Sequence, residues 1–139
     1  MTAQRPVAPA FDCLALVPCG PLRPRAAVSA ARNGGVGILD LEFAAPAVEG
    51  GFGSLDQVQW FADRLRRGDR AGLRIPAQKL TEYSPHLKVL GVTGTWLILT
   101  GEAVDRHTEW SEIAGNYRIL IEVRSADFCE RMMQAGIRP

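Results

Sequence analysis

The chain has 139 residues, of which 47% are hydrophobic and 22% charged, a size and balance that suit one globular domain with a substantial core. Sixteen Lys and Arg side chains against fifteen Asp and Glu leave no basic excess, so we expect no nucleic-acid partner. No apolar run approaches the roughly 20 residues that cross a bilayer, and the first ten residues do not resemble a signal peptide, so we expect a cytoplasmic protein without membrane contact.

The cysteines are three in number, odd and widely scattered, at Cys13, Cys19 and Cys129. With only two histidines in the chain, they predict neither a zinc or other metal site nor a disulfide framework. An odd number of free thiols is typical of a reducing compartment. We expect Cys13 and Cys129 to pack in the core.

Residues 1–10 are rich in Pro and Ala and predict a flexible arm before a single domain over 11–139. Short apolar runs between turn residues predict five strands, at 11–17, 36–43, 71–77, 95–101 and 117–123. Helices are expected between them and after the last, at 24–33, 54–67, 107–115 and 126–135. The stretch 78–91 is ambiguous because Pro85 interrupts any helix that runs through it.

Helix ends carry local signals. Asn33-Gly34 suits the left-handed turn that ends the first helix. Ser54 followed by Gln57 predicts a capping box at the start of the second helix. The basic run 64–67 is expected in the last turn of that helix, where cations complement the helix dipole.

Strands and helices alternate with the spacing of βα units, and the strands are apolar throughout, which predicts a parallel sheet with helices on both faces. The expected class is therefore α/β with about five βα units. A partial TIM-barrel-like sheet, such as the first part of a longer barrel, would have strand order 1-2-3-4-5. The alternative is a flavodoxin-like doubly wound sheet with order 2-1-3-4-5.

The first forty residues carry a more specific pattern. An apolar strand leads into Pro18-Cys19-Gly20, the helix contains Ala-Ala-Val-Ser over 26–29, and Asn-Gly-Gly-Val-Gly over 33–37 opens the second strand. Residues 11–41 thereby resemble the start of the nitronate monooxygenase (2-nitropropane dioxygenase) group of FMN-dependent (β/α)8 barrels, which includes flavin enoyl reductases. Similar domains stand at the front of large bacterial polyketide and polyunsaturated fatty-acid synthases.

The resemblance implies FMN as cofactor, with Pro18, Cys19 and Gly20 as the residues that would contact it. Several positions depart from the family pattern. Arg74 stands where the family has an Asn that faces the flavin. The family often has a His near the flavin after its fourth strand, but the stretch 97–102 contains none, and Asp40, Glu42 and Phe43 crowd the end of the second strand. The family binds the FMN phosphate through loops after later strands, so we expect no FMN on this chain alone.

Other groups with chemical potential have plainer explanations. Cys19 lies where α/β active sites gather, but without an adjacent base a buried thiol is the expected role. Glu102, Asp105 and Glu122 could pair as carboxylates at strand ends or cap helices, and His107 could act as a base or start a helix. Trp60 and Trp110 fit either a contact surface or core packing.

The expected function is accordingly a non-catalytic or degenerate FMN-barrel-like domain that serves as a structural or docking module of a larger polyketide- or fatty-acid-synthase-type protein. Its partner would be the remainder of a longer polypeptide or a second copy of the domain, which would cover the exposed sheet edge. The alternative is part of an active FMN-dependent oxidoreductase, completed by strands supplied elsewhere. The catalytic residues and the substrate are not identified by the sequence.

Overall fold

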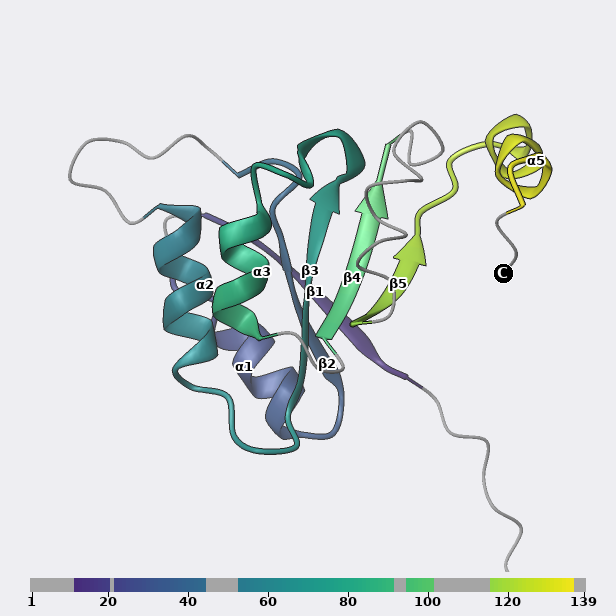
Figure 1. Ribbon diagram of the computed structural model, residues 1–139. Helices are drawn as coiled ribbons and strands as arrows, with labels where there is room; N and C mark the ends of the chain where they lie inside the picture. Colours follow the sequence, from purple (N-terminus) through teal and green to yellow (C-terminus); the bar gives the residue numbers. More distant parts are fainter. Residues whose placement is uncertain (1–11, 21, 45–52, 92–94, 102–115, 137–139) are drawn as a thin grey trace, which may run out of the picture.

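The computed structural model describes residues 12–20, 22–44, 53–91, 95–101 and 116–136 (Figure 1). Its centre is a five-stranded sheet in which every neighbouring pair is parallel. The strands are β1 (Leu14–Pro18), β2 (Val36–Asp40), β3 (Arg70–Pro76), β4 (Thr95–Thr100) and β5 (Tyr117–Ile121). All five lie within the stretches expected from the apolar runs, except that β1 extends one residue further, to Pro18, and β3 begins one residue earlier, at Arg70.

The strand order is β1-β2-β3-β4-β5, which is the order expected for a partial barrel. A flavodoxin-like sheet would instead place β1 between β2 and β3. Because parallel neighbours in chain order are joined by right-handed crossovers, the connecting helices fall on one face of such a sheet. The register aligns Leu39 of β2 with Leu73 of β3, and Leu73 with Leu97 of β4.

The described helices are α1 (Arg25–Arg32), α2 (Ser54–Ala62), α3 (Ser84–Leu90) and α5 (Ala126–Gln134), with a short 3-10 turn η1 (Ala77–Lys79) after β3. Figure 1 shows α1, α2 and α3 together on one side of the sheet and α5 beyond the end of β5. The prediction of helices on both faces is therefore wrong for α1, α2 and α3, the described helices that connect strands. Sequential strand order is the reason, since it sends every crossover to the same side.

Two glycines explain the glycine-rich turn between α1 and β2. Gly34 has φ +85°, so it supplies the left-handed turn expected after α1. At Gly37 a Cβ atom would overlap the carbonyl oxygen of Ala27 and approach the ring of Phe61. The glycine therefore lets α1 lie directly on β2, and the turn is accounted for by packing.

The two faces of the sheet carry different clusters. Leu39, Leu73 and Leu97 point toward the helices, where they are fully buried with Phe61 of α2. The alternate residues form a second, smaller cluster on the opposite face, made of Val36, Ile38, Trp96, Ile98 and, half-buried, Leu14. In a closed barrel this opposite face would be the interior, and we call it the interior face.

Local details differ from the sequence predictions at α2 and α3. The amide of Gly53 donates to the carboxylate of Asp56 (2.9 Å), so Gly53 rather than Ser54 precedes the helix. The helix ends at Ala62, before the basic run, yet Arg64 still reaches back to donate to the carbonyl of Trp60 (3.1 Å). Pro85 does not break α3, because it lies in the first turn, where no backbone donor is needed.

Cys13 and Cys129 are exposed, so their predicted place in the core was wrong. Cys13 precedes the edge strand β1, and Cys129 lies on a solvent-facing side of α5, whose buried residues are Phe128 and Met132. The predicted arm over 1–10 and the predicted helix over 107–115 lie outside the described residues. No helix in the described part of the chain has the length and apolar character to cross a membrane.

Candidate functional site

The carboxyl end of the interior face holds a compact group of charged side chains centred on Arg74. In parallel α/β folds this end of the sheet is where binding and catalytic groups gather. The Nη1 atom of Arg74 lies 2.7 Å from Oδ2 of Asp40 and also contacts the carboxylate of Glu42. Its Nη2 and Nε atoms both donate to Oε2 of Glu122, at 2.7 and 3.0 Å.

Arg124 closes this group from the side of β5. Its Nη2 donates to Oε1 of Glu42 (2.5 Å), and its Nε lies 3.4 Å from Oε1 of Glu122. We call Asp40, Glu42, Arg74, Glu122 and Arg124 the charged cluster. Three carboxylates and two guanidiniums give it a net charge near −1.

The cluster is well shielded from water near its centre and open at its rim. The side chains of Arg74, Glu42 and Asp40 are 10%, 12% and 16% exposed, whereas that of Arg124 is 56% exposed. Burial alone would raise the pKa of Glu42, but the hydrogen bond from Arg124 and the charge of Arg74 outweigh it and lower that pKa. Burial would likewise lower the pKa of Arg74, and the bond to Glu122 with the nearby carboxylates raises it instead.

The strand positions explain how the cluster assembles. Arg74 is aligned with Asp40 of the neighbouring strand β2. On its other side it reaches across β4 to Glu122, which directly follows β5 and whose amide donates to Leu99 of β4 (2.9 Å). The guanidinium of Arg74 on β3 thus links the ends of β2 and β5 and passes over the end of β4.

This arrangement favours a structural role over a catalytic one. Every nitrogen of the Arg74 guanidinium already faces a carboxylate, so it has little capacity left to bind an anionic substrate or cofactor. Glu42 and Glu122 are held as ion-paired carboxylates, unlike a general acid, whose pKa is raised. Phe43, expected to crowd the same edge, instead projects into solvent and is 81% exposed.

The residues predicted to contact a cofactor lie beside this end of the sheet, on the edge strand. Pro18 is the last residue of β1 and is aligned with Asp40. The next residue, Cys19, turns to the helix side and is buried in the main core. Gly20 is bonded through its amide and its carbonyl to the side-chain amide of Gln57 in α2.

The thiol of Cys19 is poorly suited to act as a nucleophile. Burial, assisted by the negative charge of Asp40, raises its pKa to about 11. A reactive cysteine requires the opposite shift, because the thiolate is the nucleophile. The structural interpretation of Cys19 therefore fits the geometry better than the catalytic one.

A polar contact between α2 and α3, which includes the buried ring of His86, was not predicted. The Oγ atom of Ser54 lies 2.9 Å from Nε2 of His86, whose ring also packs edge-on against Tyr83. Burial lowers the pKa of His86, so the ring is neutral at pH 7. His86 falls in the stretch 78–91 that the sequence left ambiguous, and the contact between α2 and α3 explains why its ring is buried.

The predicted candidates Glu102, Asp105, His107 and Trp110 lie outside the described residues. In the described ranges, no three or more His, Cys, Asp and Glu side chains group as a metal site would. No family model matches the sequence, and no curated protein or solved structure shows significant similarity to it. The flavin-barrel resemblance therefore rests on the residues between 11 and 41 that carry it.

Proposed function

We propose that this chain is a non-catalytic module on a partial flavin-barrel-like fold, which serves as a structural or docking unit of a larger protein. The observation that supports this most directly is the charged cluster. It occupies the end of the interior face where a flavin barrel would hold its cofactor and substrate, and Arg74 takes the position of a flavin-facing amide. A bound isoalloxazine ring would have to break several buried ion pairs.

The loop after β1 supports the same proposal. Both backbone groups of Gly20 are bonded to Gln57, and Cys19 faces the helices, so few groups of this loop are free to bind a flavin. The proposed setting, a polyketide- or fatty-acid-synthase-type protein, depends on the resemblance of residues 11–41.

The edges and the interior face of the sheet offer surfaces on which a structural module could contact a partner. The outer strands β1 and β5 each have only one neighbour among the described strands. Leu16 on β1 and Leu120 on β5 are 48% and 40% exposed on the interior face, so this face presents apolar surface to solvent at both edge strands. The proposed occupant of this face is the remainder of a longer polypeptide or a second copy of the chain.

Flavin titration tests the proposal against its alternative, an FMN-dependent oxidoreductase. The purified chain should be colourless and should leave the fluorescence of added FMN unquenched. The variant R74N, which restores the amide of the resembled family, should also fail to bind, because Asp40, Glu42 and Glu122 still occupy the site. Stoichiometric FMN binding by the unmodified chain would overturn the proposal in favour of the oxidoreductase.

A further inference from the structure

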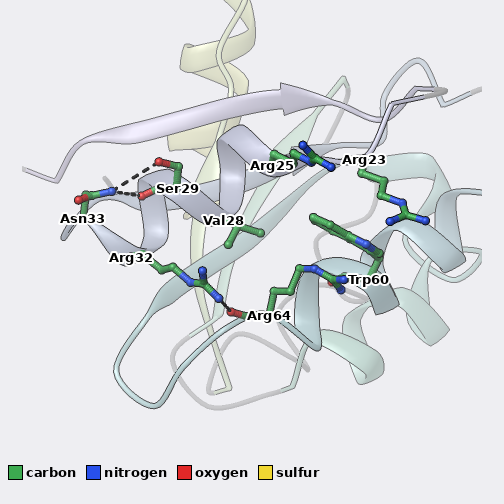
Figure 2. Close-up of a pocket in the computed structure, with 8 residues that line it drawn as sticks. All are labelled: Arg23, Arg25, Val28, Ser29, Arg32, Asn33, Trp60 and Arg64. Atoms are coloured by element: carbon green, nitrogen blue, oxygen red, sulfur yellow. Dashed lines mark hydrogen bonds between the residues drawn. The ribbon is translucent and has the colours of Figure 1, made fainter.

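Away from the sheet, a groove of about 420 Å³ runs between α1 and α2 on the outer surface (Figure 2). It is lined by four arginines together with one tryptophan, one valine and two small polar residues. The arginines are Arg23, Arg25, Arg32 and Arg64, and we call this feature the arginine groove. Among the described residues, no carboxylate lines it.

The arginines of this groove are uncompensated within the described part of the chain. None of the four has a carboxylate within 4 Å there, in contrast to Arg74 and Arg124 in the charged cluster. Instead Arg32 donates to the backbone carbonyl of Arg64 (2.8 Å), a neutral acceptor. Four like charges on one groove repel one another, so an anion that enters it gains from all of them.

Trp60 of α2 lines the groove beside Arg23 and Arg64 (Figure 2). The guanidinium of Arg64 stacks on its ring at 3.8 Å, and that of Arg23 lies at 5.9 Å, as Figure 2 shows. These contacts hold two guanidinium planes in place before any ligand arrives, which lowers the entropy lost on binding. The indole Nε1 is buried and has no hydrogen-bond partner among the described residues.

The spacing of the charges indicates the size of the ligand. Arg25 and Arg32 are the first and last residues of α1, two helical turns and about 10 Å apart along the axis. A ligand that carries several anionic groups along its length can contact both ends of α1 at once. Carboxylates two turns apart on a helix, at positions i and i+7, are separated by the same distance of about 10 Å, and guanidinium groups bind carboxylates in a paired, planar geometry.

We propose that the arginine groove is a docking site for an acidic helical segment of a partner protein. The proposal rests on the docking function proposed above and names the chemistry of the partner. Nucleic acid fits the molecule less well, because the chain as a whole has a net charge of only +1.

A labelled peptide tests this directly. The probe is an alanine-rich helical peptide with Glu at positions i, i+4 and i+7, and its counterpart carries Gln at the same positions. Fluorescence anisotropy with the full chain should show binding of the Glu peptide, weaker at about 0.15 M salt than at low salt, and no binding of the Gln peptide. The intrinsic fluorescence change on binding should disappear in W60F while the anisotropy signal remains.

Paired charge variants separate the groove from the overall charge. R25Q/R32Q removes two groove cations, and R66Q/R67Q removes two exposed cations that do not line the groove. The first double variant should weaken binding by about tenfold or more, and the second by less than about twofold. Thermal unfolding followed by circular dichroism confirms that both variants are folded.

Several results would overturn the groove proposal. These are equal binding of the Glu and Gln peptides, equal losses in the two double variants, tighter binding of an oligothymidylate than of the Glu peptide, and full displacement of the peptide by millimolar inorganic phosphate. None of them depends on flavin. FMN binding would refute the module function alone, and a failed peptide assay would refute the groove alone.

Discussion

Replacing Arg74 with methionine is the sharpest test of the charged cluster. Methionine keeps the apolar stem and removes the guanidinium, which leaves Asp40, Glu42 and Glu122 facing one another without their shared partner. Loss of one member of a buried ion pair costs about 3–5 kcal/mol. Because Glu122 is 35% exposed and partly solvated, we expect the lower end, about 3 kcal/mol. Urea unfolding followed by far-UV circular dichroism measures this loss.

The pH dependence of the stability of R74M provides a second test, because it should differ in direction from that of the unmodified chain. In the unmodified chain the pKa of Glu42 is lowered, so its contribution is complete above its unfolded pKa near 4.3 and is lost as the pH falls further. In R74M the shielded carboxylate of Glu42 loses the charge of Arg74 while its burial remains, so its pKa should rise. The stability of R74M should then improve relative to the unmodified chain as the pH falls from 7 toward about 5.

Arg118 offers a matched control for this substitution. It lies on the interior face of β5, 5.6 Å from the ring of Trp96, and has no carboxylate partner among the described residues. R118M should cost less than about 1 kcal/mol. The reasoning fails if R74M is no more destabilising than R118M, or if R74M and the unmodified chain follow parallel pH profiles.

Three further predictions concern the helix-covered side. G37A should lower the free energy of unfolding by about 1–3 kcal/mol in urea titration, because its Cβ overlaps a carbonyl of α1; an unchanged midpoint would contradict that contact. At pH 8 a disulfide reagent should label Cys13 and Cys129 rapidly and Cys19 slowly, because burial raises the pKa of Cys19 to about 11. Equal labelling rates for all three cysteines would show that the thiol of Cys19 is accessible and reactive. Burial lowers the pKa of His86, so the contribution of this ring to stability is complete above its unfolded pKa near 6.5 and is lost as the pH falls below that value. The variant H86Q should therefore flatten the dependence of the urea midpoint on pH between pH 7 and 5. An unaltered slope would assign that dependence to another group.

Local pattern was sufficient for most of the secondary structure. Ser125 accepts a hydrogen bond from the amide of Phe128 at the start of α5, as its position before a helical run suggests. Gly34 ends α1 with a positive φ for the same kind of local reason. The ambiguity at Pro85 arose because a proline in the first turn and a proline that breaks a helix look alike in sequence.

The charged cluster could be predicted only in part. Arg74, Asp40 and Glu42 were noticed separately, as departures from a flavin-binding pattern. Nothing local connects Arg74 with Glu122, which lies 48 residues further along the chain. The register of β3, β4 and β5 brings them together, and that register depends on contacts between strands that no single stretch encodes. The exposure of Cys13 and Cys129 was missed for a similar reason, since it depends on which strand or helix lies at the margin of the fold.

The sequence by itself determined that five apolar strands alternate with helices and run in one direction, because apolar runs of strand length separated by helical connections leave few other solutions. Tertiary structure decided which side of each strand meets the helices and which charges meet at the carboxyl end. Side chains alternate between faces in every strand, but only the order and register of neighbouring strands determine whether an arginine lies opposite a carboxylate or opposite solvent.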